Sequence, residues 1–336
     1  MTVRRTADTS ATPDMPDTLG SLGESGVLAR IFPRLPASRY QQLGPGDDAA
    51  VVTAPDGRVV INTDMMIHGP DFRLAWSSPH DLGWKAAASN LADIAAMGAV
   101  PTALVVAVAA PSDTPVAFLE SSADGMRHGC AALAPGCGVV GGDLSVSGTL
   151  TIAVTAFGDL EGRDPVLRSG ARVGDVVAVS GVLGEAARGL HLMFTTAVAN
   201  GEPDARALEK VRAEHPTPIA AQLTPHPPIA DGRAAAIAGA TAMLDLSDGL
   251  AIDARRLAAA SGVSLDFEAA ALRDRDDLDG GEDHSLLATF PPGTDLPGGF
   301  RAIGAVTSGA GVRVDGAPYD ERSGWDPFVG WNGGQG

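Results

Sequence analysis

Acidic side chains recur in this 336-residue chain where apolar runs that we expect to be strands begin or end. Asp47 and Asp48 follow the bend of QLGPGDDAAVV, and Asp143 follows two glycines in VVGGDLS. Ligands of open α/β sheets bind beyond strand ends. Oxygen donors without a His or Cys cluster suit several hard cations such as Mg²⁺ or Mn²⁺. The candidate metal ligands are Asp47, Asp48, Asn62, Thr63, Asp64, Asp93, Asp143, Asp245 and Asp248.

A helix is predicted over residues 80–97, because Gly98 and Pro101 follow an apolar, alanine-rich run. Few polar side chains interrupt this run, so the helix is largely covered. A covered carboxylate is costly unless it is paired or bound to a metal. Asp93 is therefore a candidate ligand, and a solvated helix edge is the competing interpretation.

Helix capping is the local alternative for Ser247 and Asp248, which precede an amphipathic run over residues 249–260. Capping does not explain why acidic groups recur at four strand ends. For Asp47 and Asp48, the alternation of a strand lets only one of the two point at a site. We favour Asp47, because it is nearer the flexible glycine, and keep both.

Rival motifs are absent from the sequence. It contains no GxxxxGK[ST], no GxGxxG, no complete EF-hand loop, no GxSxG and no HxH or HExxH pattern. We therefore interpret the seven histidines as structural or exposed. Lysine occurs only as Lys85 and Lys210, so a phosphate-cradling lysine has little support.

The formal net charge of −17 argues against nucleic acid or an anionic membrane as a partner. Metal ions bound by the carboxylates would still let the chain hold a nucleoside triphosphate. The two cysteines, Cys130 and Cys137, match no CxxC pair, and no apolar run is long enough to cross a bilayer. We expect a soluble, cytoplasmic protein.

Strand-like and helix-like runs alternate along the whole chain, which predicts an α/β (α+β) fold with two mixed domains. We place a disordered tail at residues 1–18, an N-terminal ATP- and metal-binding domain at 19–160 and a C-terminal domain at 161–336. Residues 273–283 and 291–299 are acidic or rich in Pro and Gly, and we expect surface loops there.

Eight motifs together resemble the thiamine-monophosphate kinase family, whose superfamily includes aminoimidazole ribonucleotide synthetase and selenophosphate synthetase. The resemblance runs from about residue 19 to 331. The motifs are GDDAA, NTDMMIHGPDF, SNLADIAAMGAVP, VVGGDLS, LRSGARVGD, DLSDGLAIDARRLA, GGED and GWDPF.

The resemblance implies a homodimer joined through the N-terminal sheets, and direct transfer of the γ-phosphoryl group of ATP to thiamine monophosphate with magnesium. It implies that the candidate carboxylates are metal ligands, with none acting as a covalent or acid-base group. Nucleotide-binding positions would be Gly142, Asp143, Arg168 and Ser247. Substrate-binding positions would be Asp71, Glu282 and Trp325.

The chain departs from the family pattern at two positions. Asn62 replaces a common serine and still offers a carbonyl oxygen. Asp71 replaces a common histidine, so a substrate contact survives by position but imidazole chemistry does not. The alternatives are another ATP-using member of the superfamily, of the purine-pathway or selenophosphate type, and a non-catalytic protein that binds divalent cations.

Overall fold

The computed structural model describes residues 17–45 and 49–321. The first half of the chain builds a four-stranded sheet in the order β3-β6-β4-β5, in which only β4 and β5 are parallel. The elements of the first half are α1 (Leu19–Ile31), the 3₁₀ helix η1 (Phe32–Arg34), β1 (Gln41–Leu43), β2 (Val51–Val52), β3 (Val60–Ile67), α2 (Pro79–Ala96), β4 (Val100–Ala110), α3 (Val116–Leu133), β5 (Gly138–Val146) and β6 (Thr151–Asp159).

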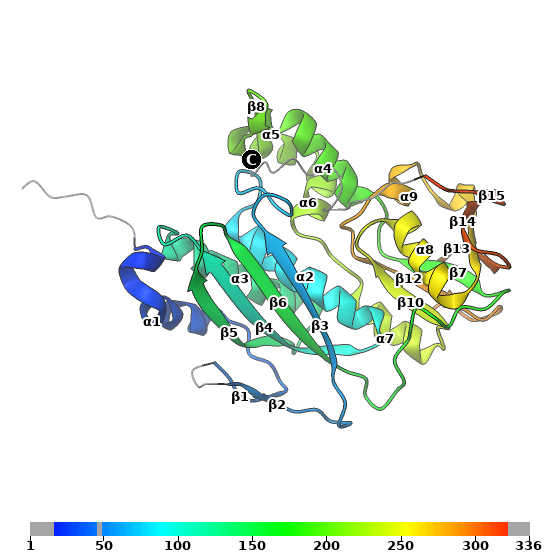
Figure 1. The fold of residues 1–336 in the computed structure, drawn as a ribbon, viewed down its shortest axis with the longest axis horizontal. Coiled ribbons are helices and arrows are strands. Elements are labelled where there is room, and N and C mark those ends of the chain that lie inside the picture. The colour runs from blue at the N-terminus through cyan, green and yellow to red at the C-terminus, as the bar shows by residue number, and fades with distance from the viewer. Residues whose placement is uncertain (1–16, 46–48, 322–336) are drawn as a thin grey trace, which may run out of the picture.

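Helices α2 and α3 cover one face of this sheet, as Figure 1 shows. The two helices pack closely because glycines lie where they meet. A Cβ atom on Gly83 would lie 1.9 Å from the Ser122 carbonyl oxygen, and one on Gly125 would lie 2.1 Å from that of His80. Alanine at either site would push the helices apart.

The opposite face of the four-stranded sheet carries exposed apolar side chains. Ile61 is 59% exposed and Met65 is 58% exposed. Figure 1 shows no helix in front of this face. Apolar side chains gathered in this way are typical of a surface that binds a partner.

The second half builds a seven-stranded sheet in the order β10-β12-β7-β13-β11-β14-β15, with β11 and β14 as its parallel pair. Helix α8 packs on it through Leu250, Ala254 and Leu257. The elements are β7 (Val176–Ser180), α7 (Ile229–Ile237), β10 (Ala242–Leu246), α8 (Leu250–Ser261), β11 (Ser264–Phe267), the 3₁₀ helix η2 (Ala269–Ala271), α9 (Asp276–Asp279), β12 (Ser285–Phe290), β13 (Arg301–Thr307), β14 (Gly311–Val314) and β15 (Ala317–Pro318).

A helical excursion leaves the second sheet after β7 and lies at the top of Figure 1. It has its own small core, in which Met193, Leu208 and Ile219 pack around Trp76 from the first half. We name residues 185–224 the cap. Its elements are α4 (Glu185–Thr196), β8 (Val198–Ala199), β9 (Glu202–Pro203), α5 (Ala205–Glu214) and α6 (Pro216–Leu223).

The α/β fold expected from the sequence is confirmed, and strands and helices alternate along both halves of the chain. The two sheets fall on either side of the expected boundary at residue 160, and the division into domains stays a proposal. Thr18, expected in the tail, instead caps α1 by accepting a hydrogen bond from the Ser21 amide. Residues 1–16 lie outside the described residues.

The prediction of a surface loop over residues 273–283 was wrong in part. This segment contains α9, and Asp277 and Asp283 within it are buried. Its acidic composition suggested solvent exposure, but the carboxylates accept hydrogen bonds from arginines and backbone amides of other elements.

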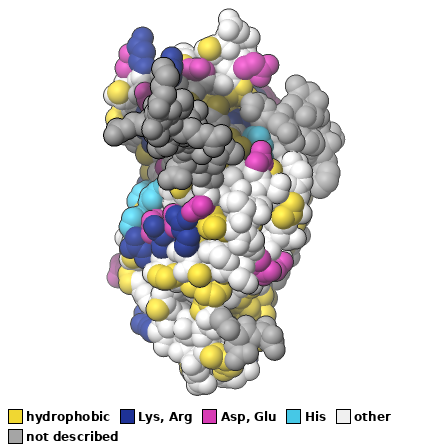
Figure 2. Space-filling model, turned by 90° about the vertical axis from the view of Figure 1, so that its left-hand side faces the viewer, with side chains coloured by type: hydrophobic (Ala, Val, Ile, Leu, Met, Phe, Trp, Pro, Cys, Tyr) yellow, Lys and Arg dark blue, Asp and Glu magenta, His cyan; other side chains and the backbone are white. Residues whose placement is uncertain are grey.

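Charged side chains of both signs gather in one band on the face shown in Figure 2. Arginines of α1 and η1 pair with acids of α3: Arg30 with Glu120 at 2.6 Å and Arg34 with Asp124 at 2.5 Å. Within the described part of the chain, no helix is long and apolar enough to cross a membrane.

Candidate functional site

Three carboxylates from three elements form what we call the carboxylate cluster: Asp64 on β3, Asp93 on α2 and Asp245 on β10. Helix α2 packs on β3 and β10 and so brings the two halves of the chain together here. Asn62 precedes Asp64 by two residues on the same face of β3, and its Nδ2 donates to Asp93 Oδ2 at 2.7 Å.

The negative charges of the carboxylate cluster repel one another. Burial, together with Asp245 and Asp64, raises the pKa of Asp93 to about 8. Burial also raises the pKa of Asp64 above its ordinary value. A bound cation would remove this repulsion, because an opposite charge favours the ionised carboxylates.

The donor set fits a hard cation in part. Asn62 Oδ1 is buried and accepts no hydrogen bond from any described residue, so an oxygen predicted as a ligand lacks a partner. Carboxylate and amide oxygens are the ligands that Mg²⁺ prefers. Among the described residues, however, no group of three or more His, Cys, Asp or Glu side chains is arranged to hold a metal ion. Asp47 and Asp48 lie outside the described residues.

His284 lies beside the cluster, and its burial is compatible with the expectation that the histidines are structural or exposed. It is 6% exposed, and its Nδ1 lies 3.6 Å from Asp245 Oδ2, too far for a hydrogen bond. Burial acts to lower the pKa of His284, but Asp245 and Glu282 raise it above its ordinary value. A search for paired-histidine motifs could not find a single histidine of this kind.

A cavity of about 920 Å³ lies beside the sheet, between α1, α3 and strands β4 and β5. Its walls are largely apolar, and Gly141, Gly142 and Asp143 line one side. Position 142 requires glycine, because a Cβ atom there would lie 2.0 Å from the Val106 carbonyl oxygen. An apolar cavity beside a glycine pair and a carboxylate suits a nucleobase with its phosphates.

A second cavity, of about 260 Å³, lies between the loop that follows β3 and the cap. Phe72, Trp76 and Phe194 supply aromatic walls, and Asp71 and Glu282 supply carboxylates. Trp76 and Phe194 meet edge to face, with ring centroids 4.8 Å apart. Aromatic faces with acids suit a flat ligand that carries positive charge.

The two predicted substrate-side acids are held differently. Asp71 Oδ2 accepts a hydrogen bond of 2.6 Å from the Ile67 amide, and burial raises the pKa of Asp71. Glu282 forms an ion pair of 2.5 Å with Lys85. Burial acts to raise the pKa of Glu282, but Lys85 and His284 lower it below its ordinary value, which keeps it ionised.

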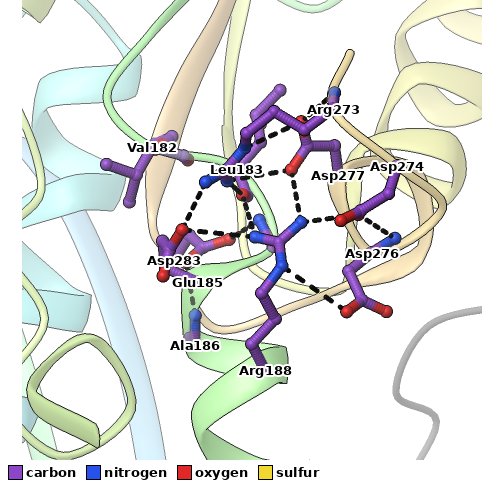
Figure 3. Close-up of polar contacts among 12 residues, drawn as sticks. Val182, Leu183, Glu185, Ala186, Arg188, Arg273, Asp274, Asp276, Asp277 and Asp283 are labelled. Carbon is purple, nitrogen blue, oxygen red and sulfur yellow. Dashed lines mark hydrogen bonds and ion pairs between the residues drawn. The ribbon is translucent and has the colours of Figure 1, made fainter. Parts of the chain in front are cut away.

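The loop that carries Glu282 is tied to the start of α4. Asp283 accepts hydrogen bonds from the amides of Gly184, at 2.5 Å, and Ala186, at 2.8 Å. Figure 3 shows Asp283 beside this helix start, with Arg188 and Arg273 among the acids of α4 and α9. The cap and the loop are therefore joined by charged hydrogen bonds, which are stronger than neutral ones.

Several predicted residues lie apart from the carboxylate cluster. The Thr63 hydroxyl donates to the Val154 carbonyl oxygen at 3.0 Å on the opposite face of β3. Alternation with buried Leu144 places Asp143 on that opposite face too, one strand beyond β4. Asp248 lies near the cluster in sequence, but pairs with Arg256 at 2.6 Å.

The remaining predicted residues are positioned by backbone contacts or lie outside the described residues. The Ser247 carbonyl oxygen accepts a hydrogen bond from the Glu282 amide at 2.8 Å. Ser247 therefore lies beside residues 280–283, which we call the GGED loop. Arg168 is exposed, and its carbonyl oxygen accepts from Ser261 at 2.7 Å. Trp325 lies outside the described residues.

Comparison with known proteins first defines the class. Residues 46–160 match the family model described as "AIR synthase related protein, N-terminal domain". The fold is also similar to that of a hydrogenase maturation protein, HypE of E. coli, at 19% identity and a TM-score of 0.63. The architecture is therefore that of the AIR synthase-like superfamily.

Closer relatives define the family. The chain is 45% identical to the thiamine-monophosphate kinase of Mycobacterium tuberculosis, over 96% of each chain, and 33% identical to that of Bacillus subtilis, over 80% and 83%. It is similar to the solved structure of AaThiL complexed with AMPPCP and TMP, with 30% identity, a TM-score of 0.68, and 92% and 99% coverage. The chain belongs to the thiamine-monophosphate kinase family, which confirms the resemblance seen in its motifs.

Proposed function

We propose that this protein transfers the γ-phosphoryl group of ATP to thiamine monophosphate, which yields thiamine diphosphate and ADP. The observation that carries the proposal is the arrangement along the first sheet. Strands β4 and β5 line an apolar cavity with a glycine pair, β3 contributes Asp64 to the carboxylate cluster, and the loop after β3 lines an aromatic cavity with two acids. A nucleotide, metal ions and a cationic substrate would occupy these places in that order.

The aromatic cavity matches the chemistry of thiamine. The thiazolium ring is a flat cation, and the exposed Phe194 offers an aromatic face while ionised Glu282 offers the opposite charge. Asp71 stands where many relatives have histidine, so it would contact the substrate as a carboxylate.

Mg²⁺ is proposed as the metal, in several ions, with Asn62, Asp64, Asp93 and Asp245 among the residues that would hold it. Bound Mg²⁺ would neutralise the charge of the transferring phosphoryl group. The roles of the other predicted ligands stay proposals. The acceptor is a phosphate that is already ionised near neutral pH, so these residues position groups and do not act as strong bases.

We also propose that the protein is a cytoplasmic homodimer joined through the open face of the first sheet. The exposed Ile61 and Met65 support this arrangement. Both cysteines are free and buried, as suits a reducing compartment.

One incubation tests the function. Purified protein with Mg-ATP and thiamine monophosphate is expected to form thiamine diphosphate and ADP in equal amounts. Free thiamine and an aminoimidazole precursor serve as control acceptors and are expected to give none. Absence of thiamine diphosphate would overturn the proposal, and phosphorylation of another acceptor would favour a different member of the superfamily.

Calorimetry separates an enzyme from a cation store. An ATP analogue is expected to bind only when Mg²⁺ is present, because the nucleotide phosphates would share the metal with the carboxylates. Mg²⁺ binding that ignores the nucleotide would support the non-catalytic alternative.

A further inference from the structure

Lys85 lies in the middle of α2, with a side chain that is only 8% exposed. It is one of two lysines in the chain. Its Nζ lies 2.5 Å from Glu282 Oε2. With its amide turned to satisfy both of its neighbours, Gln222 accepts from Lys85 Nζ at 3.2 Å and donates to the Ala186 carbonyl oxygen at 3.1 Å. One buried ammonium group thus connects α2, the GGED loop and the cap.

We infer that Lys85 is a positioning residue for substrate binding: it fixes the Glu282 carboxylate, in its charged form, in the wall of the aromatic cavity. The inference rests on the proposed function, in which that carboxylate meets the cationic part of thiamine monophosphate. Lys85, Gln222 and Glu282 all line this cavity.

Glu282 needs such a partner because its own loop holds it poorly. Two glycines, Gly280 and Gly281, precede it, and its φ of 72° lies in the left-handed region that a non-glycine residue adopts at a cost. The Glu282 amide is held by the Ser247 carbonyl oxygen, which positions the backbone but not the carboxylate. The Glu282 side chain is 29% exposed, so without a counter-charge the carboxylate would turn toward water.

The place of Lys85 on α2 adds a second function to the ion pair. Asp93 lies two turns further along the same helix, about 12 Å away at 1.5 Å per residue. Asp93 lies at the end of the site that would hold the metal and the phosphates. Lys85 lies at the end where Glu282 would contact the rings of thiamine monophosphate. A single rigid helix therefore sets the spacing between the two ends of the substrate.

The test is steady-state kinetics of Lys85→Met, with thiamine monophosphate and ATP varied separately. Truncating one partner of a buried charge pair is expected to raise the KM for thiamine monophosphate roughly 30-fold or more. The KM for ATP and the kcat at saturation are expected to stay within about threefold, because Lys85 contacts neither the nucleotide cavity nor the carboxylate cluster.

Lys210→Met is the matched control, since Lys210 is 78% exposed and pairs only with Glu214 at 3.9 Å. It should leave all three constants unchanged. In the double variant Lys85→Met with Glu282→Gln, the KM should be no higher than in Glu282→Gln alone, because Lys85 acts through Glu282.

Two results would overturn the inference. One is an unchanged KM for thiamine monophosphate in Lys85→Met. The other is a change of similar size in kcat and in both KM values, which would show a merely structural role. If Lys85→Met does not fold, Gln222→Leu tests the inference instead, with an expected rise of about threefold to tenfold in the KM for thiamine monophosphate. An unchanged KM in Gln222→Leu would overturn the inference. The wild-type protein separates the two proposals, since its failure to form thiamine diphosphate would count against the function itself.

Discussion

Replacing Asp93 by Asn should make the metal-free protein more stable while removing its response to Mg²⁺. The carboxylate lies among Asp64 and Asp245, and burial with these like charges raises its pKa to about 8. Asparagine has almost the same shape, and its carbonyl oxygen can still accept the bond of 2.7 Å that Asn62 donates. The substitution therefore removes charge and keeps the packing.

The magnitude and the pH range follow from the pKa. A folded-state pKa of about 8 against an ordinary 3.8 corresponds to at most about 6 kcal/mol of destabilisation. Because Asp64 can share the proton, we expect about 2–3 kcal/mol at pH 8. The raised pKa means that this cost is absent below pH 4, grows as the pH rises and is complete above pH 8.

Urea unfolding of the wild type and of Asp93→Asn in EDTA, between pH 5 and 8.5, measures this effect. The free energy of unfolding of the wild type should fall with rising pH more steeply than that of the variant. Millimolar Mg²⁺ should stabilise the wild type and leave the variant nearly unchanged. Asp164→Asn is the control, because Asp164 has a fully exposed side chain. Equal pH slopes, or normal activity of Asp93→Asn at limiting Mg²⁺, would refute the reasoning.

Three further variants test other parts of the structure. Asp283→Asn leaves one carbonyl oxygen for two amides at the start of α4 that now donate to separate oxygens, so thermal unfolding should show a loss of about 1.5–3 kcal/mol and the KM for thiamine monophosphate should rise. Gly83→Ala should destabilise the α2 and α3 pair by about 3 kcal/mol in urea, whereas Gly148→Ala, with open space around it, should change little. Ile61→Asp should yield monomers in analytical ultracentrifugation if the open sheet face joins two copies, and a dimer that persists would place the interface elsewhere.

The strand and helix pattern was enough to predict the α/β fold and to mark Asp64 and Asp93 as candidates for a site. Both lie on elements whose periods are clear, and a polar side chain in a covered helix must face another polar group. Asp143 shows the limit of this reasoning. We expected its strand to end at the two glycines, but β5 continues through Asp143 to Val146. The order of strands and the face on which a side chain lies also depend on contacts between distant segments. A single sequence does not show these contacts.

Lys85 and His284 were missed for a related reason. The partners of Lys85, Glu282 and Gln222, lie far along the chain, and only the fold brings His284 beside Asp245, so no local spacing marks either residue. The buried Asp277 and Asp283 were assigned to a surface loop because composition alone favours exposure of acidic residues. Arg188 and the backbone amides that bind these carboxylates lie at the start of α4, a distant segment, and their hydrogen bonds offset the cost of burial.

The separate core of the cap has an evolutionary consequence. Residues 185–224 pack among themselves and around Trp76, while Asp64, Asp93 and Asp245 belong to the two sheets and to α2. Mutations that reshape the cap can therefore change which ring system is accepted without disturbing the phosphate chemistry. A lineage could drift toward a new acceptor through this one segment, and grafting it between relatives is the direct way to exchange substrate range.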